Sequence, residues 1–236
     1  MVEEIKSALQ ALAIAEKRDF FPRFFKTGKG EYGEGDRFIG VTVPDQRKVA
    51  KAYQDRISLD ELGELLSSEV HEHRHCALIL LVGKFEKSRS SQQKKEMVDF
   101  YLSNLAYINN WDLVDASCYK LLGRYCFEND EEEVLMTLSA SDEMWHKRMA
   151  VVSTMYHVKK GRTDLTRRLV LSNMNHPHDL MHKANGWLLR EMGKANPAEL
   201  RSFLEQYAAV MPRTTLRYAV EKLDVEERRR YMEKNK

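Results

Sequence analysis

The segment from residue 109 to 125, NNWDLVDASCYKLLGRY, holds the side chains best suited to chemistry. Trp111 and Asp115 are four residues apart, so they share one face if the segment is a helix. Apolar residues surround Asp115, and a carboxylate in such a place is costly unless it is paired or functional. Asp112 lies nearer the predicted helix start, and we interpret it as an N-terminal cap or a partner of the helix dipole. The pair of Trp111 and Asp115 is therefore the candidate centre.

Two later segments offer further candidates. Arg148 lies in MWHKRMAVV and Trp187 lies in HKANGWLLRE. If these segments are equivalent helices of a repeat, their side chains line one concave surface together with Asp115 and Trp111. The alternative for Trp187 is a core aromatic residue at helical spacing.

The sequence gives weaker signals for a metal site and for a serine nucleophile. His71 and His75 have the i, i+4 spacing of helical metal ligands, but no third ligand follows at a fixed spacing, and Glu72 points elsewhere on the helix. Ser153 has no base near it and no G-x-S-x-G context. We therefore expect no metal, no cofactor and no serine hydrolase.

The elements that must position these residues are helices. Only 5 prolines and 11 glycines interrupt the chain, and apolar residues recur at helical spacing between them. Helix start signals recur at Pro44-Asp45, at Ser58, at Ser141-Asp142-Glu143 and at Asn196-Pro197. The sequence predicts an all-α protein.

The long helical segments align with one another at a small residue. Ala77, Ala150, Gly186 and Ala219 occupy this position, with spacings of 73, 36 and 33 residues. A period in the middle thirties is typical of a superhelical solenoid of HEAT-like helix pairs. We predict a single HEAT-like repeat domain over residues 1–236, with an irregular helical bundle as the alternative.

One segment, residues 28–41, does not fit the helical pattern. It reads GKGEYGEGDRFIGV and holds five of the eleven glycines, so we expect an ordered loop there. It lacks the Walker lysine pattern and the G-x-G-x-x-G pattern of nucleotide-binding loops.

Composition favours a folded protein, and the distribution of charge favours one that binds a polyanion. The chain is 43% hydrophobic and 31% charged, and its net charge is +2. Residues 1–144 carry 19 basic and 26 acidic side chains, whereas residues 145–236 carry 19 and 10. This asymmetry points to nucleic acid as one partner, although basic helices are often only solvated faces.

The ends and the cysteines of the chain bear on its location. No membrane span and no signal peptide is evident. Cys76, Cys118 and Cys126 are interpreted as reduced core residues. We expect a cytoplasmic, monomeric protein that is associated with the nucleoid through DNA.

Several segments together resemble the AlkD-like DNA alkylation repair proteins, from about residue 18 to 223. They are YGEGDRFIGVTVPDQRK, NNWDLVDASCYKLLG, SASDEMWHKRMAVV, HKANGWLLREMGKANP and MPRTTLRYAVEKL. The resemblance implies a superhelix of HEAT-like repeats whose concave basic surface holds duplex DNA. It also implies a monofunctional glycosylase that releases N3- and N7-alkylated purines and leaves the lesion stacked rather than flipped out.

The resemblance also assigns residues. It implies that Asp115 is the catalytic carboxylate, that Trp111 and Trp187 are the active-site tryptophans, and that Arg148 contacts a phosphate. The family has an aromatic residue, often tyrosine, in an early helix, and Phe24 is its counterpart here without the hydroxyl. Further DNA contacts are expected from basic side chains of the carboxy-terminal part: Lys147, Lys183, Arg190 and Arg213.

Two other functions remain open at this point. The first is a non-catalytic HEAT-like module that binds damaged or branched DNA through the same surface, which shares every feature except the need for Asp115. The second is a protein-binding scaffold, which does not account for the basic carboxy-terminal part.

Overall fold

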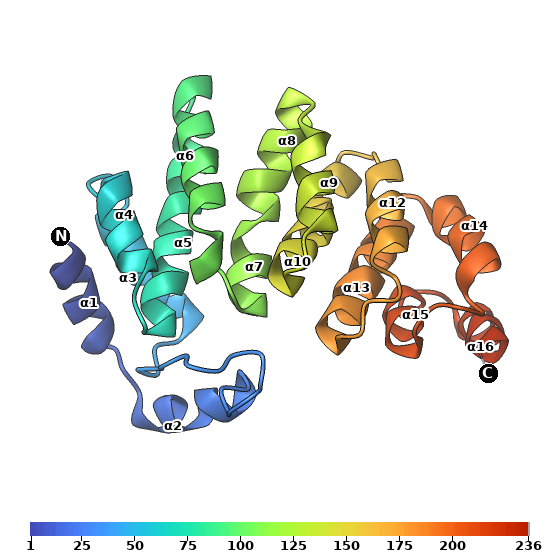
Figure 1. The fold of residues 1–236 in the computed structure, drawn as a ribbon, viewed down its shortest axis with the longest axis horizontal. Coiled ribbons are helices and arrows are strands. Elements are labelled where there is room, and N and C mark those ends of the chain that lie inside the picture. Colours follow the sequence, from blue (N-terminus) through green and yellow to red (C-terminus); the bar gives the residue numbers. More distant parts are fainter. Residues whose placement is uncertain (236) are drawn as a thin grey trace. The chain divides into compact units, whose positions relative to one another are not determined.

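The described chain, residues 1–235 of a computed structural model, is helical along most of its length (Figure 1). Within these residues the sole β-type contact is an isolated bridge between Arg37 and Val70. The predicted all-α class is confirmed, and the helix pairs are compatible with a HEAT-like repeat solenoid. The helices group into two compact units, Met1–Ser117 (unit 1) and the chain from Cys118 onward (unit 2). That residues 1–236 form one domain stays a prediction.

Unit 1 is built around the long helix α5 (His71–Lys87), whose neighbours pack on several sides of it. Twelve of its 17 residues are buried, so it is a core helix rather than a surface helix. The other helices of unit 1 are α1 (Val2–Gln10), α2 (Ala15–Phe24), α3 (Val43–Tyr53), α4 (Leu59–Leu66), α6 (Ser91–Ser103), the short η1 (Leu105–Tyr107) and α7 (Trp111–Ser117).

Two of the predicted helix starts in unit 1 are present. Ser58 caps α4 with a complete capping box, in which its hydroxyl accepts the backbone N–H of Glu61 while the Glu61 carboxylate accepts that of Ser58. Helix α3 begins at Val43 with Pro44 in its first turn. Local chemistry therefore sets these boundaries.

The segment between α2 and α3 runs as turns without a helix, and residues 28–41 lie within it. Gly40 has a φ of +88°, and a Cβ there would lie 2.2 Å from the carbonyl oxygen of Ile14. The Glu72 carboxylate accepts the backbone N–H groups of Ile39, Gly40 and Val41 at 2.8–3.2 Å. This junction fixes the loop and the start of α2 against α5.

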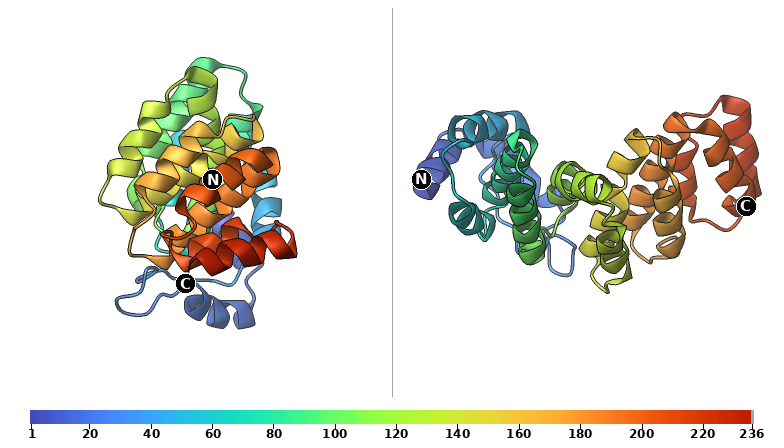
Figure 2. Two further views of the ribbon diagram at one scale, coloured as in Figure 1. Left: turned by 90° about the vertical axis from the view of Figure 1, so that its right-hand side faces the viewer. Right: turned by 90° about the horizontal axis from the view of Figure 1, so that it is seen from above.

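Unit 2 is a series of helices stacked in sequence order, drawn from yellow-green to red in Figure 2. Asn196 caps one of them through its side chain, directly before Pro197, as predicted. The elements are a π-helical turn η2 (Tyr119–Gly123), α8 (Arg124–Asn129), α9 (Glu132–Ala140), α10 (Met144–Ser153), α11 (Met155–Lys159), α12 (Asp164–Ser172), α13 (Asp179–Ala195), α14 (Pro197–Tyr207), α15 (Arg213–Ala219) and α16 (Val225–Lys234).

Three of the small residues that align between the helical segments lie at close-packed positions of unit 2. Ala150 and Ala219 are almost fully buried. Gly186 lies where a Cβ would stand 2.5 Å from both the Thr215 carbonyl oxygen and the Tyr218 Cβ. Helices α13 and α15 therefore touch backbone to backbone at this glycine.

No described helix is both long and apolar enough to cross a membrane.

The core of unit 2 contains His157, a histidine with no exposed surface. Neither ring nitrogen has a hydrogen-bond partner within residues 1–235. Burial lowers the pKa of His157 to about 4, and the positive charge of Arg162 lowers it further while Asp164 opposes this. His157 is therefore neutral in the folded protein at pH 7.

This depressed pKa predicts a loss of stability in acid. Because an unfolded histidine has a pKa near 6.5, the unfolded chain takes up a proton at this residue between pH 6.5 and pH 4, while folded His157 stays neutral. The free energy of unfolding should therefore fall less in His157→Leu than in the wild type as the pH is lowered from 6.5 to 4, and the difference should reach up to about 3 kcal/mol. Urea unfolding at pH 7 and pH 4.5 measures this difference. Equal losses in the two proteins would mean that His157 is protonated in the native state.

Candidate functional site

Helix α7 carries the two residues of the candidate centre. Its buried side holds Leu113 and Val114, while Trp111 and Asp115 are half-buried on another side. Asn110 begins the helix, since its side-chain oxygen accepts the Trp111 N–H at 2.8 Å. The two candidate residues are therefore one helical turn apart on a helix anchored by a buried face.

Aromatic rings from α2 and the residue after it pack against Trp111. Phe25 stacks on the indole with ring centroids 5.4 Å apart, and Phe24 meets it edge-on at 5.9 Å. Phe24 is 49% exposed and stacks on Phe20, which is 47% exposed. The structure thus brings the predicted residues Phe24 and Trp111 together, and the exposed ring of Phe20 lies beside Phe24.

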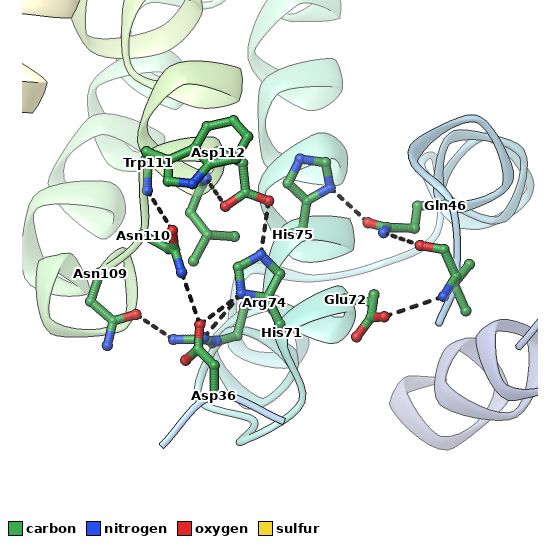
Figure 3. A network of polar contacts seen from close by, with 12 residues as sticks. Asp36, Gln46, His71, Glu72, Arg74, His75, Asn109, Asn110, Trp111 and Asp112 are labelled. Atoms are coloured by element: carbon green, nitrogen blue, oxygen red, sulfur yellow. Dashed lines mark hydrogen bonds and ion pairs between the residues drawn. The ribbon is translucent and has the colours of Figure 1, made fainter. Parts of the chain in front are cut away.

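A buried polar network, drawn in Figure 3, contacts this aromatic group where the His71 ring packs on Phe25. His71 bonds Asp36 through Nδ1 at 2.9 Å and Asp112 through Nε2 at 2.8 Å. Arg74 donates to Asp36 and also to the Asn109 side chain at 2.5 Å. The two carboxylates share the imidazole, and Asp36 also binds the guanidinium, so two negative groups face two basic groups.

The pKa values of the network follow from this arrangement. Burial lowers the pKa of His71, but Asp112 and Asp36 outweigh it and raise the pKa to about 9. Burial likewise raises the pKa of each carboxyl group, but His71 acts on both, and Arg74 on Asp36, so both values fall below their usual range. All four groups are therefore charged at pH 7.

The network adds a second role to Asp112, which its place in the sequence predicts to be an N-terminal cap or a partner of the helix dipole. Its Oδ1 does accept the next backbone N–H, that of Leu113, at 2.9 Å. Its Oδ2 is bound to His71, and Asn110 provides the side-chain bond to the first N–H of α7. Asp112 thus anchors α7 to α5 by a charged hydrogen bond.

The histidine run has partners other than a metal. Both ring nitrogens of His71 are bound to carboxylates, and His75 donates its Nδ1–H to the Gln46 side chain at 2.6 Å. Glu72 is held by the backbone N–H groups of the loop. Within residues 1–235, no three His, Cys, Asp or Glu side chains are grouped as metal ligands.

Trp187 and Arg148 belong to unit 2. Trp187 is half-buried in the middle of α13. Arg148 is only 4% exposed, and its guanidinium donates to the Leu180 carbonyl oxygen in the first turn of α13. That carbonyl is therefore one of the contacts that orient Arg148.

The other predicted DNA contacts also have partners within unit 2. Lys147 donates to the Ser139 carbonyl oxygen at 3.0 Å, and Lys183 pairs with Asp179 at 2.8 Å. Arg190 pairs with Glu221, and exposed Arg213 lies 3.5 Å from the Asn235 carbonyl oxygen. A phosphate that binds these side chains must therefore compete with existing partners, which are weak where they are exposed.

Sequence reasoning did not identify Asp36, His71 and Arg74 as one group. Asp36 lies 35 residues before His71, and Asp112 lies 41 residues after it. The sequence shows only a run of histidines on one predicted helix, and a single sequence cannot show which distant carboxylates bind them.

Comparisons with known proteins agree with this fold. A predicted DNA alkylation repair enzyme from Enterococcus faecalis has a similar structure, with a TM-score of 0.69 and 17% identity over 90% of this chain and 97% of that one. The structure of smu.31 from Streptococcus mutans is also similar, with a TM-score of 0.51 and 14% identity over 82% of this chain and 90% of that one. These two likenesses show the fold. The sequence matches no curated protein. Residues 5–223 match the family described as DNA alkylation repair enzyme, and the chain belongs to that family.

Proposed function

We propose that this protein is a monofunctional DNA glycosylase that removes N3- and N7-alkylated purines from duplex DNA. The observation that carries the proposal is the position of Asp115 one helical turn from Trp111 on α7, with the exposed ring of Phe24 packed on Trp111, in a chain of the alkylation repair family. A half-buried carboxylate one helical turn from an indole suits a reaction that develops positive charge on a sugar.

The chemistry required of the protein is modest. Alkylation at N3 or N7 makes the purine cationic, so it leaves readily when the bond to C1′ breaks, and its charge is then neutralised by the bond electrons. The deoxyribose takes on oxocarbenium character as this bond breaks. Ionised Asp115 stabilises that charge and orients a water molecule whose oxygen bonds to C1′. The proton of that water passes to Asp115 or to solvent.

The aromatic rings hold the reacting sugar in this scheme. Trp111 presents an electron-rich face, and its own position is fixed by Phe25 stacked on it. The charged sugar gains cation–π attraction from an indole face in the transition state. Trp187 is the second indole to which this proposal gives a role in holding the sugar, and Phe24 packs against the DNA backbone.

The basic side chains of unit 2 bind the phosphates. Arg148 positions the strand next to the lesion without reading sequence, and the four other predicted contacts are Lys147, Lys183, Arg190 and Arg213. Binding through such contacts weakens steeply as salt increases. Selectivity comes from the lability of the cationic nucleoside, so the lesion stays stacked, neutral lesions react poorly and bulky cationic adducts are tolerated.

Base release and DNA binding, measured together, test the proposal. Methylated duplex DNA is incubated with the wild-type protein, and free 7-methylguanine and 3-methyladenine are quantified by chromatography while binding is followed by anisotropy. We expect both bases to be released, in bursts that scale with protein concentration. Binding without release of either base would contradict the glycosylase and favour a non-catalytic module that binds damaged or branched DNA.

A further inference from the structure

The His71 site is more constrained than a buried structural histidine needs to be. His71 is the first residue of α5, and its ring is almost fully buried. One ring nitrogen faces Asp36 from the loop after α2, and the other faces Asp112 from the first turn of α7. Three separate segments of unit 1 therefore meet at a single imidazole.

The hydrogen-bond geometry requires the charged form of this imidazole. A neutral imidazole has one N–H and can donate to one partner only, whereas an imidazolium donates from both nitrogens. Both partners of His71 are carboxylates, which accept and do not donate when ionised. With bonds of 2.9 and 2.8 Å to two ionised acceptors, both nitrogens must carry protons.

The groups that face His71 favour the same state. Asp36 and Asp112 supply two negative charges from the loop and from α7. On α5 itself, Arg74 lies 3.5 Å from Nδ1 but also binds Asp36, and His75 is neutral because burial lowers its pKa to about 4. Phe25 and Phe38 cover the ring at centroid distances of 4.9 and 4.7 Å and add cation–π attraction.

Two paths lead from His71 to Trp111. The first runs through Asp112, which is the residue after Trp111 in the chain, and through Asn110, which binds both Asp36 and the Trp111 N–H. The second runs through Phe25, whose ring packs on His71 and stacks on the indole. Displacement of the imidazole therefore disturbs Trp111 in two ways, through the backbone at residues 110–112 and through the Phe25 ring stacked on the indole.

We infer that the His71 imidazolium, bridging Asp36 and Asp112, is a positioning residue that holds α7 and Trp111 in the arrangement in which Asp115 acts. This inference rests on the proposed glycosylase function. His71 touches no substrate atom in this role. It makes the site dependent on one proton, since loss of that proton breaks one bridge bond and turns a nitrogen lone pair toward a carboxylate.

The pH dependence has a defined sign. The pKa of His71 is raised in the folded protein to about 9, so the stability that the bridge contributes is fully present below pH 6.5 and is lost as pH rises through 9, where the bridge itself loses its proton. The rate of base release should fall over the same alkaline range. This is the opposite direction to the acid effect predicted for His157.

Asp112→Asn is the variant that separates positioning from simple structural support. With asparagine at 112, a neutral His71 donates from Nδ1 to Asp36 and accepts the amide N–H at Nε2, so both bridge bonds survive without the second proton. We expect the pKa of His71 to fall by at least one unit and the alkaline loss of activity to disappear. His71→Gln cannot span both carboxylates, and we expect about 10-fold slower release at pH 7 with DNA affinity changed less than twofold.

The experiment measures three quantities against pH: the His71 imidazole titration by NMR, the single-turnover rate of base release, and Trp111 fluorescence in a Trp145→Phe, Trp187→Phe background. Ionisation of the substrate affects every variant equally, so the ratio of wild-type to Asp112→Asn rates is the readout. His157→Leu, which removes a buried histidine from unit 2, is the matched control and should keep the wild-type alkaline limb.

The outcomes separate the two proposals. A His71 that titrates near 6.5, or Trp111 fluorescence that stays constant through pH 10, overturns the positioning inference whether or not bases are released. Release with an alkaline limb that Asp112→Asn leaves unchanged also overturns it. Absence of release in the wild type contradicts the glycosylase alone, while a coupled shift in the NMR titration and the fluorescence still supports the bridge.

Discussion

Replacing Asp115 by Asn should lower single-turnover release of 3-methyladenine and 7-methylguanine by about 100-fold or more, with DNA affinity nearly unchanged. The amide has the size of the carboxylate but cannot neutralise an oxocarbenium-like sugar or accept a proton from water. Because Asp115 lies on the half-buried side of α7, away from Leu113 and Val114, the substitution leaves the buried face of the helix intact.

Asp99→Asn is the matched control for this variant. Asp99 lies on α6 in the same unit, is exposed, and pairs with Lys95 at 2.7 Å. It undergoes the same change of charge, so any general electrostatic effect on DNA binding appears in both variants. Equal rates for Asp115→Asn and the wild type would remove Asp115 from the chemistry, and a parallel loss of rate and affinity would make it a binding residue.

Much of the helical fold was predictable from the sequence because local signals determine it. Ser58 and Asn196 cap helices at the predicted places. At the third place, Glu143 stands at the N-cap position without a side-chain cap bond, and the Ser141 hydroxyl accepts the Glu143 N–H just before the helix. The serine is a turn residue there, so a cluster of capping residues locates a boundary to within a few positions only.

The candidate site was predictable only where its residues share one helix. Trp111 and Asp115 are one turn apart in the sequence pattern and in the structure. The contact of Phe24 with Trp111 joins residues 87 positions apart, and the family resemblance rather than periodicity indicated Phe24. The roles assigned to Trp187 and Arg148 stay predictions.

The His71 network could not be predicted from one sequence because its geometry depends on the loop. The i, i+4 spacing of His71 and His75 was considered as a metal signal, whereas the partners lie at Asp36, Asp112 and Gln46. Hydrophobic periodicity says nothing about where a glycine-rich segment runs. The backbone of residues 39–41 is held by Glu72 in a conformation that depends on Gly40.

Gly40→Ala should therefore be among the most damaging single substitutions outside the chemistry, costing about 3–5 kcal/mol of local stability. At a φ of +88°, an added Cβ is strained in itself, and here it would lie 2.2 Å from the Ile14 carbonyl oxygen and 2.6 Å from the Arg18 nitrogen. Both are backbone atoms of the α2 start, so no side-chain rotation relieves the overlap. The alanine must push α2 off the loop or give up the bonds to Glu72.

Gly35→Ala is the control that separates the overlap of the new Cβ with the α2 backbone from the strain of a positive φ. Gly35 lies in the same loop with a φ of +90°, and nothing stands within 4 Å of its Cβ position. Its substitution should cost only the strain of about 1–2 kcal/mol. Hydrogen exchange of residues 15–42, together with urea unfolding, compares the two variants. Faster exchange of α2 in Gly40→Ala alone, accompanied by slower base release, would show that Phe24 and Phe25 act on Trp111 only while this junction is closed. Equal hydrogen exchange in the two variants would mean that α2 accommodates the Gly40→Ala side chain without losing stability. The aromatic packing on Trp111 would then not depend on Gly40.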